Sequence, residues 1–419
     1  MVRGANMYSP FVNYKRKNGL LLVLLCLVIL FVFCSCNDVS DNVSRQENNS
    51  PSAEGFTYIS PSELEGDVQK ALEKGLTNFK LREGIQVELP EELTVCDFVY
   101  STDYTKNADR VFKLFFDEQT LSAVSIVRED KDFYGEPMTV HVGFRDEASR
   151  IHCYVSDAGF VSLFRGDLFD SFMDGGSRVK LYHADRGDDL SDSYELAGEP
   201  VTVAEAVTFA QDWLSQTYAA LEPDYKLRIK TVSVLQNDMG EYTFDLTAEK
   251  LYKGVALYDG VIYAESNAKN SKSKDGYRLY PNSLRLRIKR KGAVDGLTNS
   301  TGMVLPENKR KLDKVISLSS AMEYIQNKFT DFASPYEISD ISLKYTLTPE
   351  YDASAPHNKP DDPGVKNIGH LVWEFVMDVP AGDLPDNGAK YGDVRRFIHI
   401  DAESGEMEYE FDVSLLKMQ

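Results

Sequence analysis

The sequence predicts an α+β protein in which small antiparallel sheets are each covered by a helix. Short runs of alternating apolar and polar residues are typical of strands that bury one face. Amphipathic stretches that begin with Ser or Thr are typical of capped helices. A helix followed by the same order of strands occurs twice, with Ser317 standing 115 positions after Thr202. This repetition predicts two units of one fold behind an N-terminal α+β domain.

The N-terminal segment has the three parts of a secretory signal. Residues 1–18 carry four basic residues and no acid, and residues 20–33 form an uncharged apolar run. The Phe-Cys-Ser-Cys phrase that ends at Cys36 resembles the lipobox of bacterial lipoproteins, with Phe33 where Leu is usual. The resemblance implies cleavage of residues 1–35, lipidation of Cys36 with palmitate, and an extracytoplasmic protein anchored to the bacterial cell membrane. An uncleaved anchor is the alternative, although the run is shorter than the ~20 residues that a span needs.

The net charge limits the partners of the mature protein. The whole chain has a formal charge of −20, and loss of residues 1–35 removes four basic residues and no acid, which leaves −24. Non-specific binding to nucleic acid needs clustered cations, so nucleic acid is excluded as a partner. An acidic balance of this size favours solubility at a cell surface.

Cys96 and Cys153 are the cysteines that remain beside Cys36 after cleavage. An oxidising compartment permits a disulfide between them. Both lie in strand-like runs, so two buried free thiols are the alternative. Neither a CxxC pair nor a Cys/His spacing is present, so the sequence predicts no metal site and no cofactor.

A tether and an N-terminal domain follow the signal. Residues 36–55 are polar and rich in Ser and Asn, which predicts a flexible tether. Residues 56–198 are expected to form the N-terminal α+β domain, with a helix over 61–78 that begins at the cap Ser62. Alternating runs after it predict an antiparallel sheet covered by that helix. The expected strands are 85–89, 111–116, 138–142 and 151–155.

The two repeated units span residues 199–300 and 312–415. In the first unit, Thr202 precedes Glu205 by three positions, which is the spacing of a capping box. Ser317 takes the same place in the second unit. Each helix is followed by a strand, a turn and a strand, and then by a third strand. We expect the third strands at 284–288 and 397–400.

The last unit ends in a phrase that resembles the final hairpin of PepSY-type domains. Residues 400–407 read Ile-Asp-Ala-Glu-Ser-Gly-Glu-Met, in which Asp401 can cap the turn and Gly405 can take a positive φ. The resemblance covers residues 200–412 and implies a helix packed on a small antiparallel sheet. Such units behind a lipid anchor are similar to uncharacterised clostridial lipoproteins and to membrane-anchored accessory regulators of a cell-wall-sensing histidine kinase. That similarity implies a protein partner at the cell envelope.

Arg285, Arg287 and Lys289 alternate with apolar residues in and just after the expected strand at 284–288. In a strand, this spacing places the three basic side chains on one face. They predict either a solvent-facing side of the sheet or a patch that binds an anionic cell-wall or extracellular polymer. Acidic residues nearby would neutralise such a patch.

No catalytic motif emerges from the spacing of reactive residues. The six His residues show no metal-ligand spacing, and neither a GxSxG nor a P-loop phrase is present. The acidic run at 185–192 lacks the ligand spacing of an EF-hand. We therefore expect a non-enzymatic binding or regulatory module for a protein partner, with an anionic polymer as the alternative ligand. A hydrolase assembled from residues distant in sequence stays open.

Overall fold

Two helices of equal length begin the repeated units. α6 covers Val203–Trp213 and α7 covers Leu318–Lys328, so the two helices are 115 positions apart at both ends. The Thr202 side chain accepts the N–H of Glu205, whose carboxylate accepts the N–H of Thr202 in return. The Ser317 side chain caps α7 in the same way by accepting the N–H of Ser320. The predicted start of each helix is confirmed.

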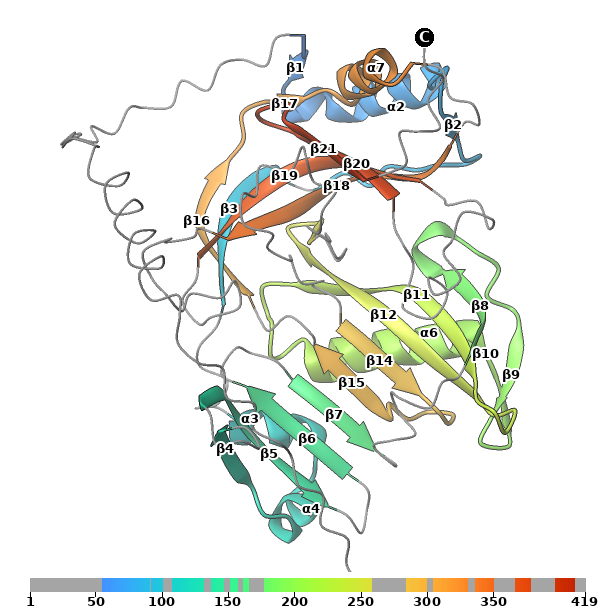
Figure 1. Cartoon of the computed structure of the whole chain (residues 1–419), viewed down its shortest axis with the longest axis vertical. Helices are drawn as coiled ribbons and strands as arrows, with labels where there is room; N and C mark the ends of the chain where they lie inside the picture. The colour runs from blue at the N-terminus through green and yellow to red at the C-terminus, as the bar shows by residue number, and fades with distance from the viewer. Residues whose placement is uncertain are drawn as a thin grey trace, which may run out of the picture. The chain divides into compact units, whose positions relative to one another are not determined.

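The chain has the predicted α+β class, mostly sheet with few helices (Figure 1). No helix of the residues described below is both long and apolar enough to span a membrane. The described residues all lie within one compact part of the chain, residues 51–419. The computed structural model describes residues 55–90, 92–100, 108–131, 137–146, 151–156, 161–165, 177–257, 284–299, 304–330, 336–349, 366–377 and 396–410.

The first sheet is antiparallel throughout and is covered on one face by α6 (Figure 1). Its order is β8-β11-β12-β14-β15-β7-β6-β5-β4. These strands are β4 (Val127–Lys131), β5 (Pro137–Asp146), β6 (Ile151–Ser156), β7 (Val161–Arg165), β8 (Ser177–His183), β11 (Lys226–Gln236), β12 (Tyr242–Tyr252), β14 (Leu284–Ile288) and β15 (Gly296–Asn299). Helices α3 (Ala108–Phe115) and α4 (Glu118–Ala123) and the hairpin of β9 (Ser193–Leu196) with β10 (Glu199–Thr202) complete this part.

The second sheet has β18 (Glu337–Pro349) and β19 (Lys366–Met377) at its centre. Beyond β19 follow β20 (Arg396–Asp401) and β21 (Met407–Glu410). Short parallel pairings join β18 to β2 (Lys80–Leu81) and to β13 (Val255–Leu257), and β19 also pairs with β3 (Thr94–Tyr100). The edge strand β16 (Val304–Lys311) pairs with β3, and β17 (Val315–Ile316) pairs with β1 (Tyr58–Ile59).

Each repeated unit therefore has the helix-on-sheet arrangement that the PepSY resemblance implies. In the second unit, α7 lies beside α2 (Leu64–Lys74), and both pack on the core face of the sheet (Figure 1). The third strands at 284–288 and 397–400 are confirmed as β14 and as part of β20. The Asp401 carboxylate accepts the backbone N–H groups of residues 403 and 404, and Gly405 has a φ of 73°, so the predicted turn chemistry is confirmed.

The segment 56–198, expected as a separate domain, contributes to both cores. Its helix α2 and the β3 residues Cys96 and Phe98 belong to the core of the second unit. Its residues from Ala108 onward belong to the core of the first unit. The pairing of β3 with β16, more than 200 positions later, produces this division, and a local sequence pattern does not reveal such a partner.

The expected strand at 111–116 is wrong, because most of it lies in α3. Ala108, Val111, Phe112 and Phe115 are all buried, and their spacing of three, four and seven positions fits a helix face. The strands at 138–142 and 151–155 are confirmed within β5 and β6. Residues 85–89 form no strand, although their side chains still alternate between partly buried and exposed.

Candidate functional site

The lipidation residue Cys36 and nearly all of the tether 36–55 lie outside the described residues. Cys96 and Cys153 are both buried, form no disulfide with each other, and lie in different cores. The free-thiol alternative is therefore the one that the structure shows. Burial raises the pKa of the Cys96 thiol to about 12, so this side chain is a core residue and a poor nucleophile.

The predicted polymer patch is only partly assembled. Arg285 is exposed and Arg287 is half-buried on the same face of β14. Arg287 lies in register opposite Asp245, with 3.9 Å between the guanidinium and the carboxylate. Burial raises the pKa of Asp245, and the charges of Arg287 and Arg285 oppose that rise. Lys289 falls just past the end of the strand, where its backbone N–H donates to Asp295.

The acidic run at 185–192 is tied to the protein itself. Asp188 accepts the backbone N–H of His183 and pairs with Arg82 at 3.3 Å. Asp192 accepts hydrogen bonds from Lys180 and Tyr182. In the part of the chain that the structure describes, no group of His, Cys, Asp and Glu is arranged to hold a metal ion.

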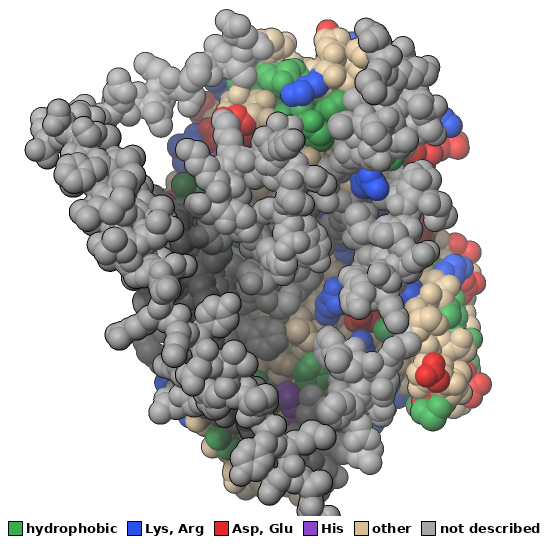
Figure 2. All heavy atoms as spheres, in the orientation of Figure 1, with side chains coloured by type: hydrophobic (Ala, Val, Ile, Leu, Met, Phe, Trp, Pro, Cys, Tyr) green, Lys and Arg blue, Asp and Glu red, His purple; other side chains and the backbone are tan. Residues whose placement is uncertain are grey.

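A cluster of basic side chains lies on and next to edge strand β16. Its members, called the basic edge from here on, are Lys309, Arg310, Lys311 and Lys314, all exposed. A bulge at Asn308, whose φ is 47°, separates the first of them from the regular pairing of β16 with β3. Four of the six residues from 309 to 314 are basic, and one, Asp313, is acidic. Acidic and basic side chains are interspersed on the face shown in Figure 2.

Each cation of the basic edge contacts a fixed neighbour. Arg310 reaches both carboxylate oxygens of Glu403 at 2.7 Å, and Lys311 pairs with Glu92 at 3.2 Å. The ammonium groups of Lys309 and Lys314 lie 5.4 and 4.9 Å from the ring centres of Tyr252 and Tyr58. Aromatic faces attract cations without cancelling their charge, so Lys309 and Lys314 keep theirs. Glu403 and Glu92 offset Arg310 and Lys311, and the exposed Asp313 lies within the same run. The sequence contains this signal in the Lys-Arg-Lys run, but exposure and neighbours need the structure.

A second charged cluster is buried on the sheet faces opposite the helices. In the second unit, Lys344 Nζ lies 2.6 Å from Glu374 Oε1, and His399 Nε2 donates to Glu374 Oε2 at 2.9 Å. Burial by itself would raise the pKa of Glu374. The charge of Lys344 and the hydrogen bond from His399 outweigh that effect and hold the pKa well below its usual range.

The first unit has a matching pair. Lys230 Nζ lies 3.8 Å from Glu249 Oε2, and Arg228 reaches the other oxygen of the same carboxylate at 2.5 Å. The charge of Lys230 also contributes to the low pKa of Glu374, so the two buried pairs lie within electrostatic reach of each other. Lys230, Glu249, Lys344 and Glu374 are each at most 3% exposed, so these ion pairs are closed to solvent. Removing one partner would leave a buried charge without compensation.

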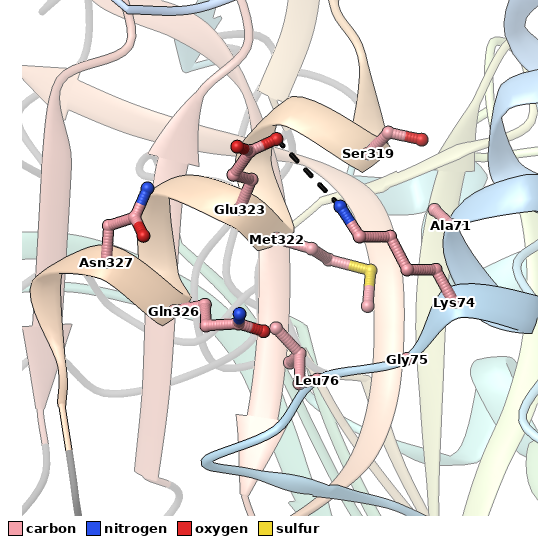
Figure 3. A pocket seen from close by; sticks show the side chains of 9 residues that line it. All are labelled: Ala71, Lys74, Gly75, Leu76, Ser319, Met322, Glu323, Gln326 and Asn327. Carbon is pink, nitrogen blue, oxygen red and sulfur yellow. Dashed lines mark ion pairs between the residues drawn. The ribbon is translucent and has the colours of Figure 1, made fainter.

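A small pocket lies between α2 and α7 (Figure 3). Lys74 and Glu323 approach to 4.0 Å across it, and both side chains are about two-thirds exposed. The side-chain oxygen of Gln326, another lining residue, accepts the N–H of Thr77. The pocket is thus a shallow gap between two helices and holds exposed rather than buried polar groups.

No family model and no curated protein matches the chain. Two solved structures are similar to it. One is an uncharacterized protein from Eubacterium rectale, at 12% identity and a TM-score of 0.49, over 78% of this chain and 90% of that chain. The other is the Bacillus megaterium YpeB C-terminal domain, at 12% identity and a TM-score of 0.33, over 75% of this chain and 99% of that chain.

Proposed function

We propose that the chain is a lipid-anchored protein of the bacterial cell envelope whose folded part is a non-enzymatic binding or regulatory module for a protein partner. The proposal starts from the signal that ends at Cys36 and from the two repeated units. It adds a surface for the partner, the basic edge. Lys309 and Lys314 of this surface lie over aromatic rings and not against carboxylates, whereas the acidic run at 185–192 is tied to residues of the protein itself.

The position of the basic edge carries the proposal. The chain that comes from the expected anchor enters the fold at β1, where Tyr58 pairs with Ile316 of β17. Lys314, next to β17, lies over the Tyr58 ring, and the Tyr58 hydroxyl donates to the backbone carbonyl of Glu403, the ion partner of Arg310. A flexible tether of about 20 residues spans roughly 25 Å on average. The basic edge would therefore stay close to the membrane and to other membrane proteins.

The chemistry of the edge favours an acidic partner segment. Cations clustered in one place speed the encounter with an acidic surface, and distant acids of the same chain are screened beyond about 10 Å. Pro306 and the bulge at Asn308 interrupt the free side of β16, as in edge strands that are protected from strand addition. The partner would accordingly be held by side chains of the basic edge and not by an added strand.

The alternative ligand, an anionic polymer at Arg285, Arg287 and Lys289, has less support. Arg287 faces Asp245, and Lys289 lies beyond the strand. Of these three predicted residues, Arg285 is the exposed one, and polymer binding without specific pockets depends on several cations acting together. The interpretation of 284–288 as a sheet face with paired charges is therefore the simpler one.

Site-specific crosslinking in intact cells tests the proposal. A photoreactive phenylalanine at Leu305, an exposed residue on β16, should link the chain to one envelope protein, whereas the same group at the exposed Met239 should not. Identical products at both positions, or none at position 305, would contradict the proposal.

Charge reversal adds a matched control. The triple variant K309E/R310E/K311E should reduce crosslinking at position 305 at least tenfold. The control variant K70E/K80E/K226E changes the net charge equally at exposed residues elsewhere and should leave crosslinking intact. If purified protein instead binds phosphatidylglycerol vesicles through the basic edge and no protein product forms, the partner is the lipid surface and the proposal is wrong.

A further inference from the structure

A lysine, a glutamate and an asparagine meet inside the core of the first unit. Lys250 and Asn299 are completely buried, and Glu222 is 3% exposed. Lysine is among the residues least often buried in this way, because its ammonium loses hydration on burial. The three residues come from three elements: β12, the segment after the π-helical turn at Leu214–Tyr218, and the end of β15.

Strand register brings Lys250 and Asn299 together. Ala248 pairs with Leu284, and Leu284 pairs with Asn299, so these three residues share one face of the sheet. Lys250 lies two residues after Ala248 and faces the same side. This is the face covered by α6, where the neighbouring positions are apolar.

The contacts hold the three polar groups against one another. Lys250 Nζ lies 2.7 Å from Glu222 Oε1 and 3.5 Å from Asn299 Oδ1. The amide nitrogen of Asn299 donates to the hydroxyl of the buried Tyr218 at 3.0 Å, which directs the amide carbonyl toward the lysine. Among the described residues, the second carboxylate oxygen of Glu222 has no hydrogen-bond partner and can carry a proton.

We propose that Lys250 and Asn299 become joined by an intramolecular amide bond, with Glu222 as the proton carrier. Glu222 takes a proton from the Lys250 ammonium, and the neutral Nζ attacks Cγ of Asn299. Glu222 passes a proton to Nδ2, and the Cγ–Nδ2 bond breaks as ammonia leaves. The new Nζ–Cγ amide loses its extra proton to Glu222. Atoms balance with the loss of one ammonia, and no oxidant, metal or cofactor takes part.

The buried site supplies the conditions that this reaction needs. A fixed contact between amine and amide replaces a rare encounter in water and raises the effective concentration of the nucleophile by many orders of magnitude. The reaction also removes an ammonium charge from an apolar core, where ions are costly. The bond would tie β12 to β15 and would stabilise the first unit against unfolding and proteolysis outside the cell, whatever the partner is.

Mass spectrometry of the full mature chain tests the inference. The intact protein should be lighter than its sequence by one ammonia. Trypsin should yield residues 231–253, uncut after Lys250, joined to residues 292–309. Lys344, which has a buried carboxylate partner of the same kind in Glu374, should appear only in linear peptides.

Variants separate the bond from a simple ion pair. Asn299→Ala and Glu222→Gln should restore the full mass, with residues 231–250 released as a linear tryptic peptide. The wild-type result is decisive even where a variant fails to fold. A wild-type chain of full mass with cleavage after Lys250 would show that the three residues form an ion pair and hydrogen bonds only, and would overturn the inference.

Discussion

Lys344 and Glu374 form a buried ion pair on neighbouring strands, with 2.6 Å between Nζ and Oε1. The same relationship recurs in the first unit between Lys230 and Glu249. All four side chains are at most 3% exposed. Each repeat thus buries a lysine beside a glutamate.

The strand register gives the two places a similar geometry, except that Lys230 lies at a β-bulge of β11 whereas Lys344 pairs with Val372. Glu374 pairs in register with Ser342, and Lys344 follows Ser342 by two positions. Glu249 pairs in register with Arg228, which Lys230 follows at the same distance. The repeat therefore extends from the helix and its cap into the buried polar layer.

Glu374→Gln should lower the free energy of unfolding by about 3–5 kcal/mol, because it leaves Lys344 buried without a counter-charge. Urea denaturation of the full mature chain measures the change. Glu323→Gln, in an exposed pair with Lys74, is the control and should cost about 0–1 kcal/mol. Equal losses in both variants would mean that burial does not set the strength of these pairs.

The pair of His370 and Asp401 should make stability depend on pH. The hydrogen bond to Asp401 raises the pKa of His370 in the folded chain. The pair contributes fully to the free energy of unfolding below about pH 6.5, the pKa of an unfolded histidine. This contribution is lost as the pH rises through the higher pKa of His370 in the folded chain. The melting temperature should fall between about pH 6 and about pH 9 by more in the wild type than in His370→Gln. Parallel curves for the two proteins would contradict this.

Asp401→Ala should destabilise the final hairpin by about 1–2 kcal/mol, because the side chain accepts the N–H groups of Glu403 and Ser404. Asp401→Asn keeps an acceptor oxygen and should recover part of this loss. Thermal unfolding of the two variants compares them. An equal loss in both would show that the charge contact with His370, and not the turn, is what matters.

Thr202→Ala and Ser317→Ala should each cost about 1 kcal/mol, since each removes the acceptor that caps a helix. Thr208→Ala is the control inside α6, where alanine improves helix propensity and should not destabilise. Denaturant midpoints of the three variants give the comparison. A loss in Thr208→Ala as large as in the cap variants would refute the assignment of the caps.

The elements that sequence predicted best are those set by local chemistry. The caps at Thr202 and Ser317, the turn at 401–405 and the third strand at 284–288 each depend on a few adjacent residues. The division of residues 56–198 between the two cores could not be predicted from local sequence, because β3 pairs with a strand more than 200 positions away. The apolar run at 111–116 is compatible with a helix or a strand by its pattern alone. In the structure most of it is helical and packs in the core of the first unit.

The candidate sites also combine features that local sequence predicts with features that depend on long-range pairing. Arg285 and Arg287 were predicted to share a face, and they do, but Asp245 becomes their neighbour through pairing of β12 with β14. Glu222 and Asn299 are 28 and 49 positions from Lys250, so no spacing rule links them. Folding brings these three polar residues into contact inside the core.

Anchoring at Cys36 is the central claim, because the partner surface has meaning only on a membrane-held protein. Cells fed radiolabelled palmitate should yield label on the wild-type chain and none on Cys36→Ala, which should also keep residues 1–35 attached. Label that persists in Cys36→Ala, or a wild-type chain without label, would contradict the account.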